Sequence, residues 1–225
     1  FLAGGILGTF HHLYFSATPT AVLALGATFS ALEIVPLVLI GYEAYHNYSL
    51  SRSTPWIKAY KWPIYYFIAM CFWNFLGAGI FGFSINPPIA LYYIQGLNTT
   101  AVHGHAALFG VYGILGIGLI LFVLRGLYPD REWNDKLLGW SFWLINIGLL
   151  VMLVGSLLPI GILQAVESIQ NGYWSARSME FMQTDTMQAI RWLRVPGDSL
   201  LAIGELLLVY FIIGLHTGWS LKGKR

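Results

Sequence analysis

Two pairs of histidines are the residues of this chain whose type and spacing best fit metal chemistry. His11 and His12 are adjacent, and His103 and His105 are separated by one residue in the stretch NTTAVHGHAALFGVYG. Neutral imidazole is the commonest side-chain ligand of transition metals and also binds haem iron. Residues two apart on an α-helix project about 200° from each other. We therefore expect His103 and His105 to hold two different haem irons, one on each side of their helix.

The adjacent histidines need an irregular backbone if both rings are to bind one ion. Neighbouring residues on a regular helix differ in direction by about 100°. Gly8 precedes the pair and Pro19 follows it, so the sequence predicts the end of a helix here, with both rings aimed at one metal. Two nitrogen ligands do not complete a transition-metal site. We expect the missing ligands to come from a part of the polypeptide outside this sequence.

Glu33 is a candidate for proton transfer. It lies in the apolar stretch SALEIVPLVLI, 14 residues beyond Pro19, which is about 21 Å along a helix. That distance places it near the middle of a membrane, where a carboxyl group usually marks a proton route or an ion site. A structural hydrogen bond to a backbone carbonyl is the alternative.

Arg177, Arg191 and Arg194 are candidates for binding an anionic group. All three lie in a predicted loop, residues 165–195, on the same side of the membrane as the histidines. A guanidinium pairs with carboxylates in a fork-like geometry, so Arg191 and Arg194 are expected to bind haem propionates. An amphipathic segment whose arginines contact lipid phosphates is an equally good interpretation.

The segments that must position these residues are long enough to cross a bilayer. The chain is 57% hydrophobic and only 10% charged, which excludes an ordinary soluble domain. A transmembrane helix needs about 20 apolar residues, and five such segments are predicted, at residues 19–44, 62–84, 101–125, 137–163 and 197–219.

The predicted fold class is therefore an all-α, polytopic transmembrane bundle. The first residues, FLAGGILGTF, lack the basic region and cleavage site of a signal peptide, and we interpret them as the end of a sixth span. The expected surroundings are the lipid bilayer and not nucleic acid. Cys71, inside the second span, is predicted to be a small buried apolar residue.

The distribution of basic residues predicts how the chain is threaded. One side of the membrane holds nine of the 12, namely Arg52, Lys58, Lys61, Arg125, Arg131, Lys136, Lys222, Lys224 and Arg225. The positive-inside rule makes that side cytoplasmic. Both histidine pairs then fall on the outer side, although no histidine entered the count. His46, in a predicted cytoplasmic loop, and His216 are interpreted as ordinary interfacial residues.

The same residues resemble a known family. A vicinal HH followed about ninety residues later by HxH is similar to the catalytic subunit of the haem-copper oxidases. The segments FHHLYFSATP, EIVPL, AVHGHAALFGVYG and YWSARSMEFMQTDTMQAIRWLRVPGD resemble bacterial nitric oxide reductases of the single-chain, quinol-dependent type. The resemblance covers residues 1–225, as the C-terminal transmembrane portion of a longer catalytic subunit whose upstream helices are missing from this sequence.

The resemblance also implies cofactors and their ligands. His11 and His12 would bind a non-haem iron, His103 a high-spin haem b and His105 a low-spin haem b, while Glu33 matches a carboxylate near the binuclear centre. A third iron-binding histidine, a further glutamate and the second axial ligand of the low-spin haem would belong to upstream helices. The implied reaction is reduction of two nitric oxide molecules to nitrous oxide and water with electrons from quinol. The implied location is the bacterial inner membrane, with the histidines toward the periplasm.

Three alternatives stay open. A haem-copper oxidase that reduces O2 would share the histidine pattern, but such oxidases tend to carry a lysine on the corresponding helix, and residues 18–45 contain no lysine or arginine. A nitric oxide reductase that takes electrons from cytochrome c would have the same histidines. A membrane haem-binding or transport protein without enzymatic activity would hold haem between two histidines and lack an iron with an open position.

Overall fold

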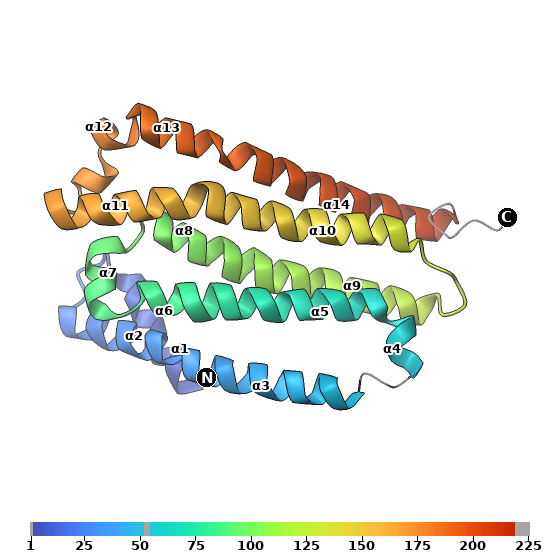
Figure 1. Ribbon diagram of the computed structural model, residues 1–225. Coiled ribbons are helices and arrows are strands. Elements are labelled where there is room, and N and C mark those ends of the chain that lie inside the picture. The colour runs from blue at the N-terminus through green and yellow to red at the C-terminus, as the bar shows by residue number, and fades with distance from the viewer. Residues whose placement is uncertain (1, 52–54, 219–225) are drawn as a thin grey trace.

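The computed structural model describes residues 2–51 and 55–218, and these residues form helices with no strand among them. Five helical rods are long and apolar enough to cross a membrane, namely Thr20–Leu50, Lys61–Ile85, Asn98–Leu127, Asp135–Asn171 and Asp185–Thr217. Figure 1 shows the rods side by side in sequence order, from the first (blue) at the bottom to the last (red) at the top. The predicted all-α transmembrane bundle is confirmed, and the protein is a multi-pass membrane protein.

Most rods consist of several helices joined end to end. In chain order the elements are α1 (Leu2–Gly8), the 3₁₀-helix η1 (Thr9–Leu13), α2 (Thr20–Leu32), α3 (Ile34–Ser51), α4 (Pro55–Ala59), α5 (Lys61–Trp73), the π-helix η2 (Asn74–Phe81), α6 (Gly82–Ile85), α7 (Pro88–Ile94), α8 (Asn98–Gly104), the π-helix η3 (His105–Gly113), α9 (Ile114–Leu127), α10 (Asp135–Met152), the π-helix η4 (Leu153–Leu157), α11 (Leu158–Asn171), the 3₁₀-helix η5 (Ser175–Arg177), α12 (Met179–Met182), α13 (Asp185–Trp192) and α14 (Arg194–Thr217). Three rods therefore contain a π-helical segment, a rare feature that occurs often at functional sites.

The helices extend further than the apolar segments of the sequence. α3 includes His46, which the sequence placed in a loop. The last rod begins at Asp185, inside the predicted loop 165–195. Hydropathy measures only the length that lipid covers, whereas a helix propagates through polar residues once it has formed. The loop is thereby shortened to residues 172–184, which hold only η5 and α12.

The core of the bundle is built on large aromatic side chains. Tyr66, Trp73 and Phe211 are each at most 1% exposed. The Trp73 ring N–H donates a hydrogen bond to Asn146 Oδ1 (2.8 Å), which satisfies its one polar atom. Cys71 is exposed, because a residue two positions from Trp73 points about 200° away from it on a helix. The prediction that Cys71 is buried is therefore wrong.

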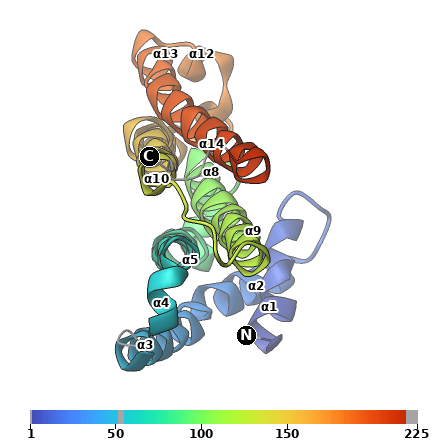
Figure 2. The same ribbon diagram turned by 90° about the vertical axis from the view of Figure 1, so that its right-hand side faces the viewer.

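Glycines let α10 pack tightly against α14. A Cβ atom on Gly148 would lie 2.5 Å from Leu201 N, and one on Gly197 would lie 2.5 Å from Met152 N. Figure 2 shows the two helices next to each other. Small residues that allow backbones to approach in this way hold transmembrane helices together.

Replacing Gly197 with alanine should destabilise the protein. The new methyl group would collide with the backbone of Met152, and overpacking of this kind costs about 1–3 kcal/mol. Gly116 is a matched control, because no atom lies within 4 Å of a Cβ built there. Gly116→Ala should unfold at or above the wild-type temperature, since alanine favours a helix over glycine by about 1 kcal/mol. Thermal unfolding in detergent measures both variants, and equal midpoints would contradict this account of the packing.

Candidate functional site

The adjacent histidines lie on η1, the 3₁₀-helix that follows α1. η1 crosses α2 at Gly26, where a Cβ atom would lie only 2.7 Å from His11 N. The rings of His11 and His12 lie beside each other, with centroids 4.1 Å apart and planes inclined by 35°. The predicted helix end is confirmed. Gly26 was not singled out from the sequence, yet its missing side chain lets this backbone approach α2.

His103, near the end of α8, points toward the second rod. Its Nδ1 lies 2.9 Å from Gly77 O, which belongs to the π-helix η2. A Cβ atom on Gly82 would lie 3.2 Å from the imidazole ring. Gly82 of the neighbouring rod therefore leaves room for the His103 ring, and the Gly77 carbonyl fixes the direction of the ring.

One cavity joins His103 to the adjacent histidines. Its volume is about 290 Å³, and His11, His12, Glu33 and His103 all line it. These four residues come from three separate parts of the chain, the η1 segment, the first rod and the third rod. The structure thus brings together four of the residues that the sequence marked as candidates for chemistry.

Glu33 reaches the cavity from a break in the first rod. α2 ends at Leu32, and Glu33 N donates to Ser30 O (3.2 Å) in a tighter turn than that of an α-helix. Pro36 has no N–H to donate to the Leu32 carbonyl, which accounts for the break. A Cβ atom on Gly4 would lie 3.1 Å from Glu33 Cγ, so α1 covers one side of this half-buried side chain. The Glu33 carboxyl makes no hydrogen bond to any residue that the structure describes.

Asn86 also lines this cavity and was missed from the sequence. It is 4% exposed, and its Nδ2 donates to Ser30 Oγ at 2.9 Å. Its Oδ1 is buried and has no hydrogen-bond partner within the described residues. The signal in the sequence was one asparagine in an apolar run before Pro87 and Pro88. The cavity therefore contains an unused acceptor beside the histidines and Glu33.

His105 faces the opposite way, toward the last rod. Its Nδ1 lies 2.8 Å from Ala101 O, and its Nε2 lies 3.2 Å from a terminal nitrogen of Arg194. Arg194 Nε also pairs with both carboxylate oxygens of Asp198, at 2.9 and 3.2 Å. The two histidines of the HxH pair thus face different rods, as predicted, although the winding changes from α to π at His105 itself.

The hydrogen bonds define which ring nitrogen carries the proton. Carbonyl oxygens only accept, so His11, whose Nδ1 lies 2.5 Å from Gly8 O, carries its proton on Nδ1. The same holds for His103 and His105, with Gly77 O and Ala101 O as acceptors. The Nε2 lone pairs of His11 and His103 are therefore available within the described residues, whereas that of His105 accepts a hydrogen bond from Arg194. A backbone acceptor on the other nitrogen is the usual arrangement of a metal-ligating histidine.

Arg191 and Arg194 line a separate cavity of about 260 Å³ together with Asp198. Arg191 is exposed, and Arg194 is half-buried against His105. The structure therefore places both arginines on the His105 side of the third rod.

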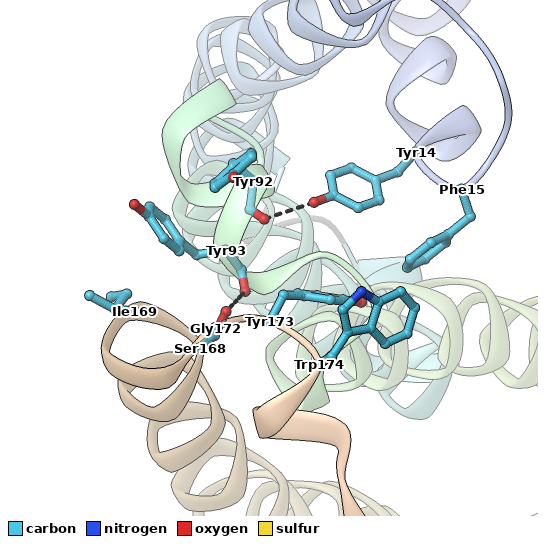
Figure 3. Close-up of a pocket in the computed structure, with 9 residues that line it drawn as sticks. All are labelled: Tyr14, Phe15, Tyr92, Tyr93, Ser168, Ile169, Gly172, Tyr173 and Trp174. Atoms are coloured by element: carbon cyan, nitrogen blue, oxygen red, sulfur yellow. Dashed lines mark hydrogen bonds between the residues drawn. The ribbon is translucent and has the colours of Figure 1, made fainter.

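Arg177 lies apart from them, beside a cavity of about 500 Å³ with six aromatic side chains in its lining, Tyr14, Phe15, Tyr92, Tyr93, Tyr173 and Trp174 (Figure 3). The guanidinium donates to the Tyr173 hydroxyl at 2.6 Å. Tyr14 donates to Tyr92 O at 2.8 Å. Burial, and then the nearby Tyr173 and Tyr92, raise the pKa of Tyr14 above its usual range. The aromatic side chains of this cavity thus connect the residues that follow the adjacent histidines to the segment between α11 and α12.

The residues present fit part of a metal-binding set. Within residues 2–51 and 55–218, no three histidine, cysteine, aspartate or glutamate side chains lie close enough to hold a metal. The ring nitrogens fit such a set, because a backbone carbonyl holds Nδ1 of His11, His103 and His105. Nε2 is available on His11 and His103, and on His105 it faces Arg194. His103 and His105 on opposite sides of one rod suit two haem groups better than one shared ion.

The chain is similar in sequence to known membrane oxidoreductases. The family model described as cytochrome c and quinol oxidase polypeptide I matches residues 1–200. A nitric oxide reductase subunit of Stutzerimonas stutzeri is 32% identical over 216 residues, which are 93% of this chain and 44% of that protein. A bacteroid cytochrome c oxidase subunit 1 homologue of Bradyrhizobium diazoefficiens is 25% identical over 213 residues, which are 89% of this chain and 36% of that protein. The chain thus spans less than half the length of these curated relatives.

Proposed function

Because the chain belongs to the cytochrome c and quinol oxidase polypeptide I family of the haem-copper oxidases, we propose that the complete subunit reduces nitric oxide. Two NO molecules, two electrons and two protons would give one N2O and one water. The observation that carries the proposal is the cavity lined by His11, His12, Glu33 and His103, with His105 facing away from it. The similarity to a subunit of a nitric oxide reductase supports this choice of substrate within a family of oxidoreductases.

The histidines are assigned to three iron groups. His103 would hold a high-spin haem b and His105 a low-spin haem b, while His11 and His12 would hold a non-haem iron on the cavity side. When bound, these groups supply the electron transfer and the open iron positions at which nitric oxide is reduced. The remaining ligands would come from upstream helices of the same catalytic subunit.

Side chains of this chain would orient the ligands and neutralise charge. The hydrogen bond from His103 to Gly77 O holds the ring in one direction and makes its Nε2 a better electron donor. Arg194, fixed by Asp198, and the exposed Arg191 would bind haem propionates on the His105 side of the third rod. A metal on His105 Nε2 would take the place of the Arg194 N–H, and Arg194 would keep its ion pair with Asp198.

Glu33 is the candidate acid of the cavity. Its carboxyl has no hydrogen-bond partner among the described residues, so it is free to give a proton to an oxygen that leaves as water. Asn86, whose Oδ1 is unused, would accept a hydrogen bond from a water molecule that resupplies the proton. These two side chains would serve the proton requirement of the reaction at the place where nitric oxide is bound.

Membrane quinol is the proposed electron donor, and cytochrome c is the alternative. The proposed location is the bacterial inner membrane with the histidine end toward the periplasm. Its support is the excess of lysine and arginine in the connections at the other end of the rods.

Reduction of O2 is the second candidate function. It is favoured by the oxidase homologues among the relatives, because the HH and HxH pattern serves both reactions. The first rod argues against it, since α2 and α3 contain no lysine, whereas the oxidases tend to carry one on the corresponding helix.

Metal content and turnover of the full-length subunit test the proposal together. We expect about three irons per subunit, two from haem and one non-haem, no copper, and nitric oxide consumption with a quinol. Copper together with O2 consumption would replace the proposal with the oxidase. Nitric oxide consumption only with reduced cytochrome c would change the donor, and two irons without either activity would leave a haem-binding membrane protein.

A further inference from the structure

A small cavity lies at the end of the bundle opposite to the histidines. Its volume is about 180 Å³, and Lys58, Lys61 and Arg125 line it together with Glu132 and Asp135. Figure 1 shows α4, the end of α9 and the start of α10 at this same end of the rods. The cavity therefore gathers three cations at the level where three of the spans begin or end.

One of the two carboxylates is already engaged. Asp135 lies 3.6 Å from Lys61 Nζ, and its Oδ1 accepts a hydrogen bond of 2.6 Å from the Trp62 ring N–H. Glu132 is exposed to the surroundings. Lys58 makes no hydrogen bond or ion pair within the described residues. With three cations and two carboxylates in its lining, the cavity keeps a net charge of +1.

Two residues that line this cavity each have a buried donor that lacks an acceptor within the described residues. Arg125 donates from a terminal nitrogen to Arg131 O at 2.8 Å, and its guanidinium carbon lies 4.3 Å from the centroid of the Trp133 ring. Arg125 Nε and the ring N–H of Trp133 are both buried and have no partner in the described part of the chain. Trp133 itself is only 4% exposed. A buried donor without an acceptor is costly, so such groups in native proteins usually meet water or an ion.

The size and depth of the cavity indicate which acceptor it takes. A water molecule occupies about 30 Å³ in the liquid, so a cavity of about 180 Å³ has room for a group larger than one water molecule. Lys61 begins one span and Asp135 begins another, which places the cavity at the membrane surface. Lipid phosphates lie at this depth, and basic pockets between transmembrane helices bind anionic headgroups.

We propose that this cavity binds a phosphate group, carried by a membrane phospholipid or free in solution. Phosphate oxygens accept hydrogen bonds from guanidinium, ammonium and indole N–H groups at once, which would satisfy both orphan donors. The binding needs no iron and no electron transfer. Phosphate binding can therefore be measured whether or not the subunit reduces nitric oxide.

The test uses the full-length subunit, purified in a non-ionic detergent without phosphate buffer. Mass spectrometry counts the phospholipid that each subunit retains, and equilibrium dialysis measures binding of radiolabelled inorganic phosphate. The variants are Lys58→Gln, which alters an exposed residue with no hydrogen bond or ion pair to the described residues, and Trp133→Phe, which removes the ring N–H and keeps an aromatic ring. Lys136→Gln and Trp140→Phe are the controls, because both residues are exposed and lie outside the cavity lining.

We expect Lys58→Gln and Trp133→Phe to weaken binding by about tenfold each, as for loss of a charged hydrogen bond, and the controls to bind as the wild type. Retained phospholipid that responds to the variants assigns the phosphate to a lipid, whereas variant-sensitive binding of inorganic phosphate alone assigns it to the solution. Absence of both, or equal binding by variants and controls, would overturn the proposal and leave ordered water as the acceptor. Because Lys58→Gln changes only an exposed side chain, a failure of Trp133→Phe to fold would leave the test intact.

Discussion

Replacing His103 with alanine in the complete subunit should lower nitric oxide turnover by more than about 100-fold. His103 is the member of the HxH pair that lines the cavity with His11 and His12, so it would hold the metal at which the substrate reacts. Groups that only orient a ligand are worth about 10–100-fold in metal affinity or activity. The ligand itself should therefore be worth more.

The haem assigned to His105 should survive this substitution. His105 faces Arg194 and is held by Ala101 O, and neither contact involves His103. The haem content should fall by one per subunit, while the absorption bands of a low-spin haem remain. His46→Ala is a matched control, because His46 is exposed on α3 and, within the described part of the chain, its ring stacks only on Tyr42, with centroids 6.3 Å apart. Full turnover by His103→Ala would show that His103 does not hold the catalytic haem, and loss of both haems at once would show that the two haem sites are not independent.

Much of the site followed from local geometry and charge. Residues two apart on a helix point in nearly opposite directions, so the separate sides of His103 and His105 could be predicted without knowing what surrounds them. The helix changes to π winding at His105, but over a separation of two residues the side chains of His103 and His105 still point in nearly opposite directions. Counting basic residues placed both histidine pairs at one end, and one shared cavity now contains His11, His12 and His103.

The parts that could not be predicted depend on contacts between distant segments. The missing side chain of Gly26 allows η1 to approach α2, but nothing in the sequence distinguishes Gly26 from the other glycines. Asn86 is buried because the helix before Pro87 ends against the first rod and Ser30 accepts its N–H. Cys71 was expected to be buried because it is apolar, although burial of a helical residue depends on which side its neighbours occupy. Each of these features requires the shape of a partner that is far away in the sequence.

Glu33→Gln should lower nitric oxide turnover by about 100-fold to 10,000-fold, the range for loss of a general acid. Glutamine has nearly the same shape as glutamate but carries no transferable carboxyl proton. The Glu33 carboxyl lines the cavity with His103 and has no hydrogen-bond partner among the described residues. Its loss should therefore remove proton delivery and leave the packing of α1 against the break between α2 and α3 unchanged.

Three measurements on the full-length subunit separate proton delivery from a structural or ligating role of Glu33. Iron content and the spectrum of the resting protein should match the wild type, while the steady-state rate falls. Glu33→Asp should restore part of the rate, because a carboxyl returns at a longer distance from the cavity. Glu43→Gln is the matched control, since Glu43 is exposed on α3 and, among the described residues, accepts a hydrogen bond only from Asn47 at 3.1 Å. Loss of iron in Glu33→Gln would show that Glu33 is a metal ligand. A wild-type rate would show that another residue delivers the protons to the cavity.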